Sequence, residues 1–207
     1  MSKTTAIIVA AGSSTRMGEY GDKIFADLCG KSVLQYSLEA FAAAESIDDI
    51  IVVTRAENFD KIHGFRVVEG GETRAESVRN GLYAIKHESG IVAIHDGARP
   101  LISPELIDRV VANCPAIPVI PVKDTIKQTQ NGFVKNTPSR ETLYAAQTPQ
   151  VFDLAMYRQA VGNGTDDSEI MERMGVKVKI VEGDERNIKI TTKQDLRIAE
   201  VLLRELN

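Results

Sequence analysis

Apolar runs of strand length alternate with helical stretches along the first half of the chain. Strands are expected near Ala6–Ala10, Ile50–Thr54, Arg66–Glu69 and Ile91–His95, and helices near Ser32–Ala44, Thr73–Lys86 and Pro104–Asn113. The strand segments are rich in Ile and Val and lack regular polar alternation, which is typical of strands covered by helices on both faces. The pattern predicts a doubly wound α/β fold with a mostly parallel sheet.

Three helix starts carry recognisable capping residues. Thr73 with Glu76 forms a capping box, Thr192 with Asp195 forms one in which Asp replaces the usual Glu, and Pro104 follows Ser103. In such boxes the two side chains satisfy free backbone N–H groups of the first turn. We therefore expect helices to begin at these three points.

The middle of the chain breaks the alternation of strands and helices. After an apolar strand at Ile117–Val122, polar and apolar residues alternate on both sides of Asn131-Gly132, a strong hairpin signal. A two-stranded ribbon is marginally stable alone in water. We expect residues 123–141 to form a projecting β-arm that packs on another subunit; a surface hairpin without a partner is the alternative.

Composition limits the possible classes. The chain has 207 residues, 43% of them apolar, which suits one domain spanning residues 1–207. A formal net charge of −4 and sparse aromatic residues argue against general nucleic-acid binding. Cys29 and Cys114 have no metal-ligand spacing, and no apolar run reaches bilayer length, so we expect a cytoplasmic protein without a membrane segment.

The loop after the first strand is the first candidate for chemistry. It is rich in small and hydroxyl residues and brings Arg16 and Lys23 close to Gly12. Free backbone N–H groups and two cations suit a phosphate. The spacing matches neither a Walker loop nor a dinucleotide fingerprint, since Ser14 stands where the second glycine of the fingerprint should be. An ordinary strand-to-helix loop is the alternative.

Further charged residues follow the carboxyl ends of other strands, where open α/β sheets bind ligands. Arg74 follows the third strand, and Asp96 and Arg99 follow the fourth. Asp96 is a lone carboxylate at a strand end and suits a divalent metal that carries phosphates. We expect these loops to converge on a site for a polyphosphate and a second anionic group.

A series of motifs resembles one enzyme family over nearly the whole chain. The segments are, in order, AAGSSTRMG followed by DK, GGETRAESVRNGL, HDGARP, PVKDTIK, YAAQTPQVF, TDDSEI and EGDERNIKIT. This order is similar to that of the 2-C-methyl-D-erythritol 4-phosphate cytidylyltransferases. The resemblance implies a Rossmann-like nucleotidyltransferase fold and a homodimer clasped by the β-arm, and the divalent cation expected at Asp96 would be Mg²⁺ or another such ion on the triphosphate. It also implies transfer of a cytidylyl group from CTP to methylerythritol phosphate with release of pyrophosphate.

The resemblance also implies roles for single residues. The catalytic cations on the triphosphate would be Arg16, Lys23 and Lys189, the last within a short strand flanked by Ile. The nucleotide would contact Ala10, Ala11, Gly12, Gly71, Glu72, Arg74 and Ser77. The acceptor substrate would contact Asp96, Arg99, Thr148 and Thr165, together with Thr125 and Arg140 from the neighbour's arm. Ser14, Asp22 and Ile24, all in or beside the phosphate loop, depart from the residues frequent in the family.

The chemistry itself needs little from the protein beyond charge and position. A phosphate monoester has a second pKa of about 6, so its oxygen is mostly ionised near pH 7 and needs no general base. Because no second titrating partner is evident for His95, we expect it to be a strand-end residue hydrogen-bonded to backbone. Asp166 and Asp167 precede a helical stretch, so we expect them to be helix caps, with metal ligands as the alternative. Three other functions stay open: a ribitol 5-phosphate cytidylyltransferase, a nucleotide-binding oxidoreductase and a non-catalytic nucleotide sensor.

Overall fold

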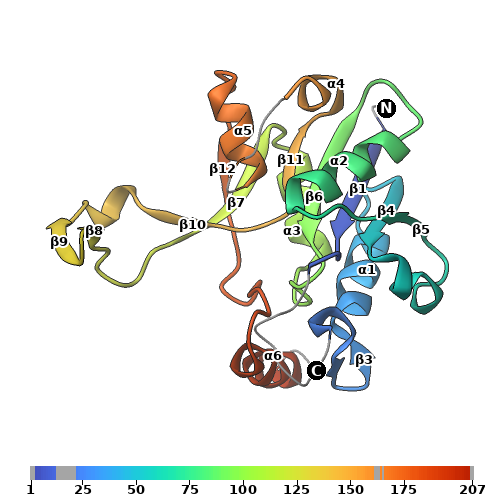
Figure 1. The fold of residues 1–207 in the computed structure, drawn as a ribbon, viewed down its shortest axis with the longest axis horizontal. Coiled ribbons are helices and arrows are strands. Elements are labelled where there is room, and N and C mark those ends of the chain that lie inside the picture. The colour runs from blue at the N-terminus through green and yellow to red at the C-terminus, as the bar shows by residue number, and fades with distance from the viewer. Residues whose placement is uncertain (1–2, 13–21, 161–163, 165, 206–207) are drawn as a thin grey trace.

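A twisted sheet of eight strands forms the centre of the computed structural model, which describes residues 3–12, 22–160, 164 and 166–205 (Figure 1). The strand order is β10-β7-β11-β6-β1-β4-β5, and β12 pairs with β7. The strands are β1 (Thr4–Val9), β4 (Asp49–Thr54), β5 (Arg66–Glu69), β6 (Ile91–Asp96), β7 (Ala116–Pro121), β10 (Tyr144–Ala146), β11 (Gln150–Asp153) and β12 (Lys179–Glu182). The pairs β6-β1, β1-β4, β4-β5 and β12-β7 are parallel, which confirms the mostly parallel sheet.

Helices cover both faces of the sheet. The helices are α1 (Val33–Ala43), α2 (Arg74–Ala84), α3 (Pro104–Val111), α4 (Leu154–Arg158), α5 (Asp167–Arg173) and α6 (Lys193–Glu205). On one face α1 and α3 pack against Ile8, and on the other α2, α4 and α5 pack against Ile7. Neighbouring residues of a strand point to opposite faces, so β1 has to be apolar at consecutive positions. The doubly wound fold predicted from the sequence is confirmed.

The predicted helix starts are present in the structure. Thr73 and Glu76 exchange both hydrogen bonds of a capping box at α2, and Ser103 accepts from the Leu106 N–H at α3. Thr192 and Asp195 also exchange both bonds at the start of α6. Each observed helix begins and ends within two residues of its predicted range where a full range was given.

Three strands of the sheet were not predicted, and one predicted strand is absent. β11 is antiparallel to both β6 and β7 and lies between them, and β10 is antiparallel to β7. Lys189 does not lie in a strand, because Asn187–Ile190 is irregular and only the earlier segment β12 pairs with the sheet. Residues 187–190 instead continue past the sheet edge toward α6, held by a hydrogen bond from the Ile190 N–H to the Ala98 carbonyl.

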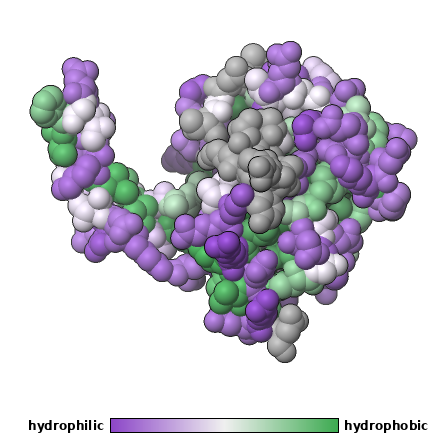
Figure 2. Space-filling model, turned by 60° about the horizontal axis from the view of Figure 1, so that its bottom comes forward, coloured by the Kyte–Doolittle hydropathy of each residue, from purple (hydrophilic) through white to green (hydrophobic). Residues whose placement is uncertain are grey.

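The predicted hairpin projects from the body of the protein (Figure 1). It consists of β8 (Gln128–Gln130) and β9 (Phe133–Asn136), with Asn131 and Gly132 between them at φ values of 52° and 82°. Positive φ at both central residues is the requirement of the type I′ turn. Phe133 is 78% exposed. Figure 2 shows hydrophobic surface on this projecting arm.

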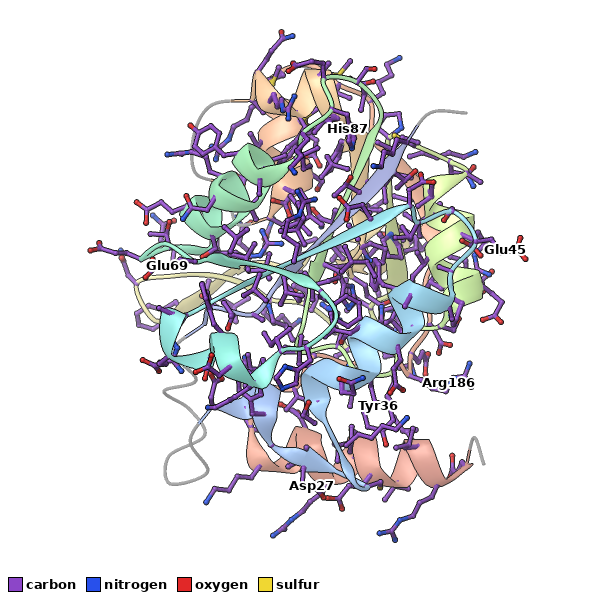
Figure 3. All side chains as sticks on the ribbon, turned by 90° about the vertical axis from the view of Figure 1, so that its right-hand side faces the viewer. Asp27, Tyr36, Glu45, Glu69, His87 and Arg186 are labelled. Carbon is purple, nitrogen blue, oxygen red and sulfur yellow. The ribbon has the colours of Figure 1, made fainter. Side chains whose placement is uncertain are left out.

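The end of the sheet near the carboxyl ends of the parallel strands carries several short elements. These are η2 (Lys23–Phe25), β2 (Asp27–Leu28), β3 (Lys31–Ser32) and η3 (Ala56–Lys61), while η4 (Arg140–Thr142) lies at the base of the arm. Figure 3 shows Asp27 of the β2–β3 hairpin beside α6. Leu28 shares a small apolar cluster with Leu196 and Ala199 of α6. Among the described residues, no helix is long and apolar enough to cross a lipid bilayer.

Candidate active site

A cavity of about 430 Å³ lies where the loops after β1, β5 and β6 meet. Its lining includes Val9, Ala10, Ala11, Gly12, Lys23, Ile24, Arg55, Gly71, Glu72, Thr73, Arg74, Ser77, Asp96, Ala98 and Lys189. Loops that are far apart in the sequence thus converge at one edge of the sheet. This confirms the prediction made from their positions directly after the carboxyl ends of the strands.

Close backbone packing shapes one wall of the cavity. A Cβ atom on Gly70 would lie 2.3 Å from the Cβ of Ala11, and one on Gly71 would lie 2.3 Å from the Cβ of Glu76. The Gly71 N–H donates to Ser77 Oγ at 3.1 Å, and this hydroxyl donates to the Thr73 carbonyl at 3.0 Å. Ser77 therefore shapes the loop through its hydroxyl, while Gly70 lets the loop pass close to the end of β1 and Gly71 lets it pass close to the first turn of α2.

Asp96 is the centre of a cluster of charged side chains. Its Oδ2 lies 2.8 Å from Lys189 Nζ and 3.8 Å from Arg99 Nε, and its Oδ1 accepts from Arg74 Nε at 3.3 Å. Burial alone would raise the pKa of the Asp96 carboxyl, but Lys189 and then Arg74 outweigh it and hold the pKa below its ordinary value. Asp96 stays ionised and fixes three cations in one place.

A second carboxylate holds Arg74 from its other side. Asp167, with a side chain only 2% exposed, accepts from Arg74 Nη2 at 2.7 Å and from the Tyr157 hydroxyl at 2.7 Å. Burial would lower the pKa of Arg74, yet the charges of Asp167 and Asp96 raise it above its ordinary value. Charges of alternating sign thus run from Asp167 through Arg74 and Asp96 to Lys189. The sequence predicts both Asp166 and Asp167 as helix caps; in the structure Asp166 is the N-cap of α5, and Asp167 pairs with Arg74 instead.

The floor of the cluster is a buried hydrogen-bond network around Thr148. Its Oγ1 accepts from the Asp96 N–H at 3.1 Å and lies 2.9 Å from Nδ1 of the fully buried His95. The Asn187 side chain donates to the Thr148 carbonyl at 3.0 Å, and Arg99 Nη1 donates to the Asn187 carbonyl at 2.7 Å. This network fixes the segment that carries Lys189. Burial lowers the pKa of His95 to about 3, so this imidazole is neutral near pH 7.

The structure brings most of the predicted site residues together. Lys23, Lys189, Asp96 and all seven predicted nucleotide contacts line the cavity, while Arg99 and Thr148 lie in the cluster behind it. Arg16 and Thr165 lie outside the described residues. Thr125 and Arg140 do not line this cavity; both are exposed at the arm, and Arg140 Nη1 donates to the Lys123 carbonyl at 2.6 Å.

The residues around Asp96 do not fit the metal site predicted there. Both carboxylate oxygens already face cations, and a Mg²⁺ ion beside them would meet three positive side chains. Within the described parts of the chain, no group of three or more His, Cys, Asp or Glu side chains gathers to hold a metal. The sequence indicated an isolated carboxylate because Lys189 is so distant along the chain.

Arg55 lines the cavity but lies in no motif that identified it from the sequence. Arg55 directly follows β4, and its Nη2 lies 2.7 Å from Oδ2 of Asp22, the residue before Lys23.

A larger cavity of about 650 Å³ lies between α2, α4 and α5, and its lining contains none of the predicted site residues. The smaller cavity is therefore the candidate active site.

Comparison with known proteins agrees with this geometry. The family model for 2-C-methyl-D-erythritol 4-phosphate cytidylyltransferase, IspD, matches residues 4–205. The chain belongs to this cytidylyltransferase family. A relative of that name from Caldanaerobacter subterraneus subsp. tengcongensis is 45% identical over 97% of this chain and 99% of its own. Another from Trichodesmium erythraeum is 41% identical over 95% of this chain and 97% of its own.

Solved structures of family members share the fold. The 4-diphosphocytidyl-2C-methyl-D-erythritol synthase of Anaerococcus prevotii superposes with a TM-score of 0.84 at 36% identity, over 98% of this chain and 96% of its own. The Thermus thermophilus 2-C-methyl-D-erythritol 4-phosphate cytidylyltransferase gives a TM-score of 0.82 at 32% identity, over 99% and 100%. Near-complete coverage in both directions makes this chain a nucleotidyltransferase of the same architecture.

Proposed function

We propose that this cytidylyltransferase joins CTP to 2-C-methyl-D-erythritol 4-phosphate and releases pyrophosphate. The observation that carries the proposal is the cluster of Lys23, Arg74 and Lys189 on one cavity, built by a chain of this family. The names of the relatives favour methylerythritol phosphate over ribitol phosphate as the acceptor. The same family membership argues against an oxidoreductase and a silent sensor.

The reaction is an attack of one phosphate on another. A phosphate oxygen of the acceptor forms a bond to the α-phosphorus of CTP, and the bond from that phosphorus to the bridging oxygen of the β-phosphate breaks. Pyrophosphate leaves with this oxygen and its electron pair. Because the acceptor phosphate is mostly dianionic near pH 7, no general base is required. The neutral, buried His95 is consistent with a structural role.

The protein then has to hold two anions together and stabilise the charge that develops on the leaving group. Lys23 and Lys189, with Arg16, are proposed to contact the triphosphate, and Ala10–Gly12 and Gly71–Glu72 to bind the nucleotide. Arg99, Thr148 and Thr165 are proposed to bind the acceptor beside Asp96. Fixed cations of this kind stabilise phosphoryl-type transition states without rearranging during the reaction.

A divalent cation is proposed to be part of the nucleotide substrate. The Asp96 cluster is already charge-balanced by side chains and does not suit a metal. A triphosphate, by contrast, brings several oxygen ligands of its own, which Mg²⁺ prefers, and such sites use few protein ligands. We therefore expect the enzyme to use the magnesium complex of CTP.

The arm is proposed to join two subunits into a homodimer. Its exposed apolar residues, Ile126, Phe133 and Val134, would lose contact with water against a partner chain. Thr125 and Arg140 lie on this arm and would reach the acceptor in the partner's site. A homodimer would thus complete two sites that a single chain leaves without these residues.

The test of the proposed function is product formation from defined substrates. Pyrophosphate release is measured with CTP and methylerythritol phosphate, with UTP in place of CTP and ribitol 5-phosphate in place of the acceptor as controls. We expect release that depends on both CTP and methylerythritol phosphate. Faster release with ribitol 5-phosphate would replace the proposed acceptor, and no release with any pair would reject the function.

A further inference from the structure

The turn that carries Lys23 is held by residues from a distant segment. Lys23 lies in η2, and Asp22 is the N-cap of this turn: the Phe25 N–H donates to the Asp22 carbonyl at 3.0 Å, and the Ile24 N–H lies 3.5 Å from Asp22 Oδ1. The Ile24 side chain is 3% exposed and packs in the core. The backbone beside Lys23 is therefore fixed on its apolar side by Ile24.

On its polar side, the turn is held by η3, the short helix after β4. Arg55 Nη2 donates to Asp22 Oδ2 at 2.7 Å, and the side-chain amide of Asn58 donates to the same oxygen at 3.1 Å. Asn58 is only 1% exposed, and its Oδ1 accepts from Lys61 Nζ at 2.9 Å. The Lys61 ammonium in turn lies 4.8 Å from the centre of the Phe25 ring. The network thus contacts the turn on both sides of Lys23.

The charges in this network bear on the cavity. Asp22 has a side chain only 9% exposed, and it is a carboxylate next to a residue that lines the cavity. A carboxylate there repels a triphosphate unless a cation balances it. Arg55 supplies that cation and itself lines the same cavity as Lys23. The hydrogen bond to Asp22 also raises the pKa of the Arg55 guanidinium above its ordinary value, so the charge is permanent.

We propose that Arg55 is a positioning residue for the reaction: it holds Asp22 so that η2 presents Lys23 to the nucleotide, and it cancels the charge of Asp22 beside the triphosphate. The inference rests on the proposed function, since it assigns Arg55 a part in CTP binding.

The test compares CTP binding by calorimetry and steady-state kinetics in the full-length protein for four variants. Arg55→Gln removes the guanidinium that pairs with Asp22 Oδ2 while the carboxylate stays in place. We therefore expect the Kd and KM for CTP to rise about tenfold, the effect of removing one compensating charge beside the bound triphosphate. Asp22→Asn combined with Arg55→Gln restores the balance of charge and should return both constants to within about threefold of the unsubstituted protein. Arg55→Lys keeps the charge and should bind CTP nearly as well.

Arg66→Gln is the matched control, because Arg66 pairs with Asp49 at the opposite end of β4 and β5 with a similar exposure of 31%. It should lower the melting temperature without changing CTP binding. Normal CTP binding by Arg55→Gln, or failure of the double variant to recover it in a folded protein, would overturn the inference alone. Absence of CTP binding by the unsubstituted protein would overturn the proposed function and this inference with it.

Discussion

Removal of the Lys189 side chain should lower the turnover number strongly and the stability of the protein only slightly. In the structure Lys189 Nζ lies 2.8 Å from Asp96 Oδ2 at the cavity wall, and its side chain is 39% exposed. If this cation stabilises the charge that develops on the triphosphate, its loss should raise the barrier by about 3 kcal/mol, by analogy with single oxyanion-stabilising donors. That corresponds to a turnover number about 150-fold lower.

The expected loss of stability is much smaller. Asp96 keeps Arg74 and Arg99 when Lys189 is removed, and the lysine is more than a third exposed, so solvent screens its interaction. We expect the free energy of unfolding of Lys189→Ala to fall by about 1 kcal/mol at most, or about 3 °C in melting temperature. The expected rise in the activation barrier is therefore about three times the expected loss in the free energy of unfolding.

Lys31→Ala provides the matched control. Lys31 Nζ also lies 2.7 Å from a carboxylate, that of Glu39, and its side chain is 48% exposed, but Lys31 does not line the cavity. Pyrophosphate release under saturating substrates and thermal unfolding are measured for both variants. Lys31→Ala should keep the normal turnover number. A folded Lys189→Ala protein with turnover within about threefold of normal would refute the assigned role of Lys189.

Three further predictions concern charge, pH and the arm. Asp96→Asn should lower turnover and reduce the free energy of unfolding by about 3 kcal/mol, because three cations then face a neutral amide. The Mg²⁺ concentration needed for half-maximal activity should not change. Rescue of activity by added Mg²⁺ would instead identify Asp96 as a metal ligand. The pKa of His95 is about 3 in the fold against 6.5 as the ordinary value, so the unfolded chain binds more protons between these values and stability falls as pH decreases through this window. Urea unfolding at several pH values should show a loss of up to about 1.4 kcal/mol per pH unit from this group, and an equal slope in His95→Asn would contradict it. Mixing inactive Arg140→Ala with inactive Lys23→Ala should restore up to about half the activity per heterodimer if the arm completes the partner's site; subunit exchange, shown by mass, without recovered activity would count against the shared site.

Elements of the fold could be predicted where burial or helix capping imposes a recognisable pattern of residues on the sequence. β1, β4 and β6 are apolar at consecutive positions because helices cover both of their faces, and α2 begins at a capping box that is visible in the residues. The sequence does not predict β10, β11 and β12 because each has only three or four residues, and β11 and β12 also begin and end in polar residues. Short edge and antiparallel strands depend on their partners more than on their own composition.

Site residues could be predicted from the sequence where they lie in family motifs. They could not be predicted where a residue's role depends on contacts between segments that are distant along the chain. Lys189 was identified by its motif although its backbone is irregular. Asp96 was interpreted as a metal ligand because the sequence does not show that Lys189, Arg74 and Arg99 surround it. Arg55 has no motif around it, and only folding brings η3 against the turn of Lys23.

The central claim is that the acceptor phosphate attacks the α-phosphorus of CTP at this cavity. The most direct measurement supplies methylerythritol phosphate labelled with ¹⁸O on its phosphate together with unlabelled CTP, and determines the mass of both products. The account predicts that all the label remains in CDP-methylerythritol and none appears in pyrophosphate, and that Lys189→Ala slows formation of both products equally. Label in pyrophosphate, or CTP cleavage without a labelled cytidylyl product, would contradict the account.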